Sequence, residues 1–258
     1  MELLLQRARS AFPELRNESI YVIDQSRTAT SEEALRSRLG PVQILRFPVS
    51  EPHVVMTGHD HAAALNLAVR EINCDYLMIF DSDAHPVSPV ARLHIADLFA
   101  AGNDAVLAGL RLDDSRSHPC FMVFGPAIDR GRLWFDEGQL EAGVDTGRMV
   151  YEQVGALGRR AELLRPEPAF GGRWGTFYLE HTIYHHGSSS FPSNPDPRLQ
   201  AQAASWRHEH AFYGRRVMAG RYDLAPSEGR LADALARWKR LPNRIGASLR
   251  RALDTSTE

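Results

Sequence analysis

Lysine and cysteine are rare in the chain, and long apolar runs are missing. The low net charge, the few cysteines and the lack of apolar runs each exclude a class of protein. Lys239 is the only lysine among 30 basic residues, and a net charge of −2 gives no electrostatic basis for binding nucleic acid. Cys74 and Cys120 are the only cysteines, which suits a reduced cytoplasmic protein better than a disulfide framework. No apolar run reaches the roughly 18 residues of a membrane span, and the first residues lack a signal-peptide pattern. We therefore expect a cytoplasmic protein that binds no nucleic acid.

Short apolar runs alternate with segments of helical periodicity along most of the chain. This alternation predicts an α/β fold with a mainly parallel sheet flanked by helices. The run YLMIF at 76–80 is apolar at every position, as in a strand buried on both faces of such a sheet. Strands are expected at 19–24, 42–47, 76–80, 105–112 and 120–125, and helices at 2–12, 30–39, 61–72, 88–102 and 146–158.

The proline-rich segment FPSNPDP at 191–197 divides the chain into two parts. We predict an α/β domain over 1–195 and a helical, arginine-rich extension over 196–258. Basic amphipathic helices either pack on their own domain or a second subunit, or lie peripherally on an anionic membrane. Packing is the favoured interpretation, with peripheral membrane contact as the alternative.

Two aspartates, Asp81 and Asp83, follow the most apolar of the expected strands. In an open α/β sheet, ligands bind beyond the carboxyl ends of the strands. Paired carboxylates at that place can hold Mg²⁺ or Mn²⁺, which prefer oxygen ligands and bridge to phosphate oxygens. Such a triplet also arises by chance, and a strand-ending aspartate often caps the next helix. The position directly after 76–80 favours the metal interpretation.

Two segments, SIYVIDQS at 19–26 and TGHDHAAALNLAVREINCDYLMIFDSDAHP at 57–86, resemble glycosyltransferase family 2 in their order and content. Members of that family have the Rossmann-like GT-A fold and use nucleotide-diphosphate sugars. The resemblance extends over roughly residues 3–190 and is clearest at 53–86. It implies an aspartate at the end of the second strand, then a glycine-containing segment and helix, then an Asp-x-Asp triplet.

The resemblance assigns roles to individual residues of this chain. It implies a metal and diphosphate site at Asp81 and Asp83, with Ser82 in contact with the nucleotide sugar and Asp24 near the nucleobase or ribose. Gly58 precedes a helix whose free N–H groups can face a phosphate, although the alanines that follow equally indicate close packing of that helix on the sheet.

The chain departs from the family pattern at its first residues. Family members begin with a further strand, at the centre of the sheet, ahead of the first helix. Here Met1 already adjoins the expected helix at 2–12. The resemblance therefore implies a GT-A-like sheet without its first strand.

An inverting sugar transfer needs a carboxylate that takes a proton from the acceptor hydroxyl. Asp145 is the first choice, because the sequence DTG ahead of an expected helix resembles the acceptor side of related transferases. Asp145 can equally be the N-cap of that helix. Asp136 and Glu137 are the reserve candidates.

A histidine-rich segment, YLEHTIYHHGSSS, lies at 178–190. If 177–185 formed one strand, His181 and His185 would share a face. His186 would project to the opposite face, so one of His185 and His186 would reach the metal site and the other would not. A late histidine that closes over the diphosphate is common in the resembled family. Both His185 and His186 are therefore candidate metal ligands.

The sequence as a whole predicts a metal-dependent, inverting glycosyltransferase of the hexosyltransferase type. The donor would be a nucleotide-diphosphate sugar, with a UDP sugar as first choice, and the acceptor a saccharide or lipid-linked hydroxyl in cell-surface polysaccharide or glycolipid synthesis. Two alternatives stay open: a metal-dependent phosphoester hydrolase with mixed Asp and His ligands, and a nonenzymatic subunit that binds a nucleotide sugar.

Overall fold

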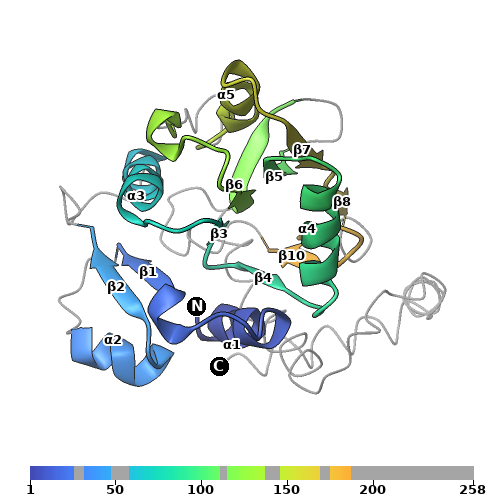
Figure 1. The fold of residues 1–258 in the computed structure, drawn as a ribbon. Helices are drawn as coiled ribbons and strands as arrows, with labels where there is room; N and C mark the ends of the chain where they lie inside the picture. Colours follow the sequence, from blue (N-terminus) through green and yellow to red (C-terminus); the bar gives the residue numbers. More distant parts are fainter. Residues whose placement is uncertain (26–31, 48–57, 111–114, 137–145, 169–174, 187–258) are drawn as a thin grey trace, which may run out of the picture. The chain divides into compact units, whose positions relative to one another are not determined.

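The structure is a computed structural model, and it describes residues 1–25, 32–47, 58–110, 115–136, 146–168 and 175–186 (Figure 1). The described helices are α1 (Glu2–Ala11), α2 (Glu32–Leu39), α3 (Gly58–Glu71), α4 (Ala91–Ala100) and α5 (Val150–Ala156), with short 3₁₀ turns η1 (Asn17–Ser19) and η2 (Arg130–Arg132). The described strands are β1 (Tyr21–Asp24), β2 (Gln43–Arg46), β3 (Leu77–Phe80), β4 (Ala84–Pro86), β5 (Ala105–Gly109), β6 (Ser117–Phe124), β7 (Ala161–Leu164), β8 (Glu167–Pro168), β9 (Thr176–Tyr178) and β10 (Ile183–His185).

Each helix and strand expected from the sequence has a counterpart near its expected position, so the α/β class is confirmed. The expected helices at 88–102 and 146–158 both end at a glycine, and these glycines have the left-handed conformation that glycine adopts without steric cost. Gly102 follows α4 with φ of 87°, and Gly158 follows α5 with φ of 70°. The proposed extension at 196–258 lies outside the described residues.

The described strands form three sheets whose directions are mixed. One sheet has the order β3-β6-β5-β7, a second has the order β4-β10-β9-β8, and β1 pairs with β2 alone. Only β1 with β2 and β5 with β7 are parallel, and the other five described pairings are antiparallel. The expectation of a mainly parallel sheet is therefore wrong for the described strands.

Layers on both faces explain why apolar runs misled the prediction of strand direction. In the sheet β3-β6-β5-β7, helices α3 and α5 pack on one face, and α1, α4 and the sheet that contains β4 and β10 cover the other. A strand is apolar along its whole length whenever both its faces are buried, whatever the direction of its neighbour. β5 is buried at every position, although it pairs antiparallel with β6.

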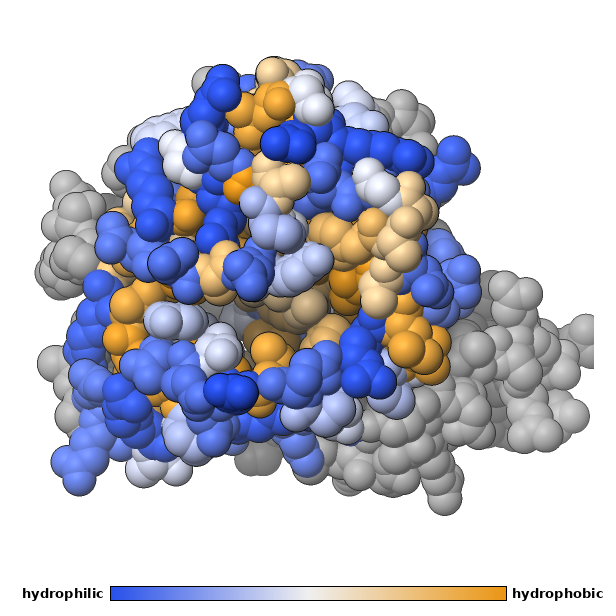
Figure 2. Space-filling model, viewed as in Figure 1, coloured by the Kyte–Doolittle hydropathy of each residue, from blue (hydrophilic) through white to orange (hydrophobic). Residues whose placement is uncertain are grey.

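The β1–β2 pair has no described strand pairing with the other two sheets. Its core is a small cluster with α1 and α2, formed by Leu5, Ile20, Val22, Leu39 and Val42. Figure 2 shows mostly polar residues over α2, and a hollow near the centre of the same face. The departure from the family pattern implied a sheet without its first strand, and in the described residues β1 and β3 belong to separate sheets.

Asn66 on α3 fixes the segment after η2 through two buried hydrogen bonds. Its Nδ2 donates to the carbonyl of Phe135 at 2.9 Å, and its Oδ1 accepts from the Phe135 N–H at 3.0 Å. Asn66→Ala would leave both backbone groups of Phe135 buried without these partners, so it should lower the free energy of unfolding by about 2–4 kcal/mol. Chemical denaturation should show this loss, and the exposed Asn73→Ala should change stability little. Equal stability of the two variants would contradict it.

The turn between β9 and β10 corrects the expectation of one strand over 177–185. Leu179, Glu180 and His181 all have left-handed backbone conformations, with φ of 53°, 52° and 63°. The chain therefore reverses, and β10 runs antiparallel to β9. His181 lies in the turn, where it pairs with Glu167 at 2.6 Å, and does not share a strand face with His185.

Glycine in this turn should stabilise the protein. A left-handed conformation costs a non-glycine residue about 1–2 kcal/mol, and glycine loses about 0.5–1 kcal/mol of that advantage through chain entropy. Glu180 is exposed, and its carboxylate lies 3.7 Å from His94 Nε2, a long distance for an ion pair. Glu180→Gly should therefore raise the free energy of unfolding by up to about 1 kcal/mol. Glu14→Gly, at an exposed turn residue outside the left-handed region, is the control and should not stabilise; a destabilised Glu180→Gly protein would contradict the reasoning.

Candidate metal centre

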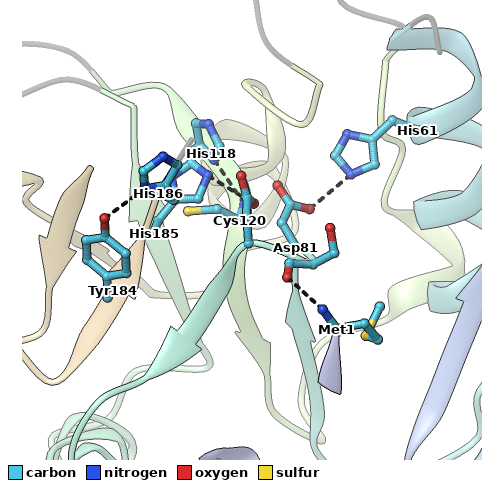
Figure 3. Close-up of polar contacts among 10 residues, drawn as sticks. Met1, His61, Asp81, His118, Cys120, Tyr184, His185 and His186 are labelled. Atoms are coloured by element: carbon cyan, nitrogen blue, oxygen red, sulfur yellow. Dashed lines mark hydrogen bonds and ion pairs between the residues drawn. The ribbon is translucent and has the colours of Figure 1, made fainter. Parts of the chain in front are cut away.

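The Asp-x-Asp triplet forms the tight connection between β3 and β4 (Figure 3). The N–H of Asp81 donates to the carbonyl of Cys120 at 3.0 Å, and the N–H of Ala84 donates to the carbonyl of Asp81 at 3.0 Å. The carbonyl of Ser82 lies 3.5 Å from the backbone nitrogen of Met1. Asp83 is buried and Asp81 is half-buried. These backbone contacts fix the main-chain positions from which the two carboxylate side chains project.

A bulge in β6 brings two further side chains to the same place. Leu107 of β5 pairs with Met122, but the next residue of β5 pairs with His118, so three residues of β6 fall between the two pairs. Pro119 is the first of them and has no N–H to donate to a ladder, which is why proline in a sheet favours such bulges. The distorted strand carries His118 and Cys120, whose side chains lie at the end of β3 (Figure 3).

His185 reaches the triplet because β10 pairs with β4. The antiparallel register places His185 opposite Ala84, and the N–H of His186 donates to the carbonyl of Asp83 at 3.1 Å. His185 Nε2 then lies 3.6 Å from Asp83 Oδ1, with both side chains about nine-tenths buried. The pairing of two short strands thus joins residues that are about a hundred positions apart in the sequence.

Two groups of potential metal ligands result, and they share one histidine. Asp81, Asp83 and His185 form the first, and His118, Cys120 and His185 form the second. In each group the ligand atoms lie within 4.8 Å of one another. The first group can hold a metal ion through two carboxylates and an imidazole, and the second through a thiol and two imidazoles. Each group suits a divalent cation, but carboxylates favour Mg²⁺ or Mn²⁺, whereas a thiolate with imidazoles favours Zn²⁺.

Asp81 is held in its ionised form by neighbouring histidines. Burial alone would raise the pKa of its carboxyl group, but the charge of His61 and a hydrogen bond from that ring lower it well below its usual range, with smaller contributions from His118 and His185. His61 Nε2 on α3 lies 3.1 Å from Asp81 Oδ1. The carboxylate is therefore available as a ligand, and His61 orients it.

Cys120 and His185 influence each other's ionisation. Burial alone would raise the pKa of the Cys120 thiol, but the nearby rings of His185 and His118 lower it towards neutrality. Burial alone would lower the pKa of His185, but the sulfur of Cys120 and the carboxylate of Asp83 raise it. Each of the two groups therefore favours the charged form of the other.

His186 lies beside the cluster but belongs to neither ligand group. Its Nδ1 is hydrogen-bonded to the hydroxyl of Tyr184 at 2.9 Å, and Figure 3 shows this pair to one side of the Cys120 and Asp81 side chains. The structure thus brings His185, and not His186, into both groups found among the described residues.

The other predicted site residues have more varied positions. Asp24 is half-buried at the end of β1, and Gly58 is the first residue of α3. Asp136 pairs with Arg148 at 3.2 Å. Asp145 and Glu137 lie outside the described residues.

Three residues of the cluster were not among the predicted site residues: His61, His118 and Cys120. The spacing H-P-C offers a signal for two of them, because residues i and i+2 of a strand project to one side and a proline between them marks a bulge. His61 had no comparable signal, since its partner lies 20 positions away.

Comparisons with known proteins leave the family open. No family model matches the sequence, and no curated protein matches it. Among solved structures, the crystal structure of mannose-1-phosphate geranyltransferase from Thermus thermophilus is similar, with 12% identity and a TM-score of 0.29. The match covers 81% of this chain and 54% of that one, so the chain spans about half the length of that protein. A likeness this distant establishes neither a shared fold nor a shared function.

None of the helices described in the structure is long and apolar enough to cross a membrane.

Proposed function

We propose that the chain is a divalent-metal-dependent glycosyltransferase whose donor is a nucleotide-diphosphate sugar. The observation that carries this proposal is the convergence of Asp81, Asp83 and His185 at the end of β3, with ligand atoms within 4.8 Å of one another. Two carboxylates and one imidazole fit Mg²⁺ or Mn²⁺, which accept oxygen and nitrogen ligands. The resemblance of 19–26 and 57–86 to glycosyltransferase family 2 supports the choice of donor.

The chain's own residues have separate roles in this proposal. Asp81, Asp83 and His185 hold the cation, which when bound neutralises charge on the diphosphate leaving group. His61 orients Asp81 through the contact at 3.1 Å. Ser82 and the first turn of α3, from Gly58, face the donor phosphates. Asp24 binds the nucleobase or ribose.

Asp145 is the proposed acceptor-side base. A base acts in the transfer step and does not hold the nucleotide, so Asp145→Asn should lower turnover at least about a hundredfold and leave donor affinity nearly unchanged. An N-cap aspartate would behave differently, because asparagine caps a helix about as well. Steady-state turnover and calorimetric UDP affinity of the variant decide the matter. Wild-type turnover in the folded variant would contradict the assignment and move the test to Asp136 or Glu137.

A phosphoester hydrolase is the second candidate, favoured by the mixture of carboxylates and imidazoles around the triplet. Such an enzyme needs no nucleotide and typically holds two metal ions about 3.5–4 Å apart. A nonenzymatic nucleotide-sugar-binding subunit is the third. All three predict a metal site, but they differ in nucleotide binding and in turnover.

Calorimetric titration with UDP, in the presence and absence of Mn²⁺, separates these functions. The glycosyltransferase proposal predicts tight binding that depends on Mn²⁺, followed by release of UDP when the correct sugar nucleotide and acceptor are supplied. The same UDP affinity with and without Mn²⁺, or no UDP binding at all, would contradict the glycosyltransferase proposal. Thermal-shift screening of nucleotide sugars would then identify the donor.

We further propose that the reaction takes place in the cytoplasm and that the acceptor is a saccharide or a lipid-linked hydroxyl. A lipid-linked acceptor would suit peripheral contact of the segment 196–258 with the inner face of the membrane. Vesicle sedimentation with anionic and neutral lipids tests that contact: binding only to anionic vesicles supports it.

A further inference from the structure

We propose that His118, Cys120 and His185 form a zinc site that shares His185 with the carboxylate group. The Sγ atom of Cys120 and one nitrogen of each ring lie within 4.8 Å of one another. The ring centroids of His118 and His185 are 4.8 Å apart, and Figure 3 shows the sulfur of Cys120 pointing toward the ring of His185. The three residues come from a strand bulge and from a strand that pairs with β4.

Burial sets this group apart from accidental clusters of polar residues on a surface. Cys120 has no exposed surface and His185 is 8% exposed. The backbone is fixed at both ends of the cluster, because the carbonyl of Cys120 accepts from Asp81 N–H and β10 is paired on both of its edges. The three donor groups are thus held together in the folded protein before any ion binds.

The donor set selects zinc over the cations proposed for the carboxylate group. Thiolate and imidazole are the ligands that Zn²⁺ prefers, whereas Mg²⁺ and Mn²⁺ prefer oxygen. Three protein ligands leave a fourth position open, as in zinc sites that bind water or substrate. Cysteine binds metal as the thiolate.

His118 must change one contact to take part. Its Nδ1 accepts the N–H of Cys120 at 3.0 Å, so the neutral ring carries its proton on the other nitrogen. Coordination through Nδ1 would replace this hydrogen bond with a metal–nitrogen bond. An asparagine at position 118 keeps a hydrogen-bond acceptor near the Cys120 N–H but supplies no imidazole, which makes His118→Asn an informative variant.

The shared histidine has a consequence for metal choice. A neutral imidazole can bind one cation, because its second nitrogen carries the ring proton. Zinc at the thiol group and Mn²⁺ at the carboxylate group would therefore compete for His185. Zn²⁺ should therefore release Mn²⁺ from the protein, and this part of the inference rests on the proposed function.

The experiment uses the full chain without a histidine tag. Zinc affinity is measured by competition with a chromophoric chelator, and Co²⁺ replaces Zn²⁺ to report thiolate ligation through its near-ultraviolet charge-transfer absorption. The wild-type chain should show this absorption. Cys120→Ser should abolish this absorption. Cys120→Ser and His118→Asn should each lower zinc affinity at least about a hundredfold, because that is the largest loss typical of residues that support a metal ligand, and these two residues are proposed to be ligands themselves.

Cys74→Ser is the matched control, because Cys74 is the other cysteine and lies outside both ligand groups. Its sulfur is 3.2 Å from Arg130 Nη1. This variant should keep both the absorption and the zinc affinity. Circular dichroism checks the fold of every variant, and His118→Asn decides the outcome if Cys120→Ser does not fold.

Three results would overturn the zinc site: no zinc binding by the folded wild-type chain, cobalt binding without thiolate absorption, or unchanged zinc affinity in the folded His118→Asn variant. Mn²⁺ binding followed by electron paramagnetic resonance separates this failure from failure of the proposed function. The Cys120→Ser variant should still bind Mn²⁺. If the wild-type chain did not bind Mn²⁺, that result would contradict the glycosyltransferase proposal but not the zinc site.

Discussion

Replacing Asp81 or Asp83 by asparagine should abolish Mn²⁺-dependent binding of UDP and leave the fold intact. The two carboxylates stand at the end of β3 with His185 within ligand distance, and an amide oxygen is a far poorer ligand than a carboxylate for a hard cation. The side chains are close in size, so packing around the triplet should survive. Calorimetry with UDP and Mn²⁺, together with circular dichroism, measures both effects.

Asp75→Asn is the control for this pair of variants. Asp75 is exposed just ahead of β3, at the opposite end of the same strand, and belongs to neither ligand group. The Asp75→Asn variant should bind UDP and Mn²⁺ like the wild-type chain. Unaltered Mn²⁺-dependent UDP affinity in both Asp81→Asn and Asp83→Asn would remove the triplet from the site.

His185→Ala should weaken donor binding, whereas His186→Ala should mainly lower stability, although the two residues are adjacent in the sequence. His185 lies 3.6 Å from Asp83 and belongs to both ligand groups. Its loss should weaken Mn²⁺-dependent donor binding at least about tenfold, because changing a residue that merely supports a metal ligand already weakens metal binding by that factor.

His186→Ala should act mainly on stability. His186 is hydrogen-bonded to the buried hydroxyl of Tyr184, and leaving that hydroxyl without this partner should lower the free energy of unfolding by about 1–3 kcal/mol. Donor affinity of the folded protein should stay near the wild-type value. Equal effects of the two substitutions on donor binding would contradict the division of roles.

Local patterns predicted the five described α-helices and five of the ten described strands, because helix and strand periodicity depend on neighbours in the sequence, but they did not predict β4, β7 or β8. The run 76–80 predicted β3, and the two aspartates after it were proposed as ligands from their position, the Asp-x-Asp pattern and the family resemblance. Direction of pairing was not predictable in the same way. β6 follows β5 along the chain and runs antiparallel both to it and to β3, and nothing in an apolar run encodes that choice.

The hairpin that carries His185 shows a second limit of sequence reasoning. The three left-handed residues at 179–181 are leucine, glutamate and histidine, and none of them is a glycine, asparagine or aspartate, the residues that most clearly mark such turns. Without a glycine or proline signal, the segment read as one strand. Tertiary contacts enforce the turn, including the contact of His181 with Glu167.

The ligand groups could be predicted only in part for a related reason. Asp81 and Asp83 are neighbours in the sequence, whereas His61, His118 and His185 reach them from three other elements. Their meeting depends on sheet register: a shift of one residue in the pairing of β10 with β4 would turn His185 away and bring His186 to the same face. The sequence narrowed the choice to these two histidines, and register distinguishes them.

A crystal structure of the chain grown with Mn²⁺ and UDP, with anomalous scattering recorded near the manganese edge, tests the central claim most directly. We expect a single strong anomalous peak bound by carboxylate oxygens of Asp81 and Asp83 and by a ring nitrogen of His185, in contact with the diphosphate. A manganese peak on other residues, or UDP bound without manganese at the end of β3, would contradict the claim.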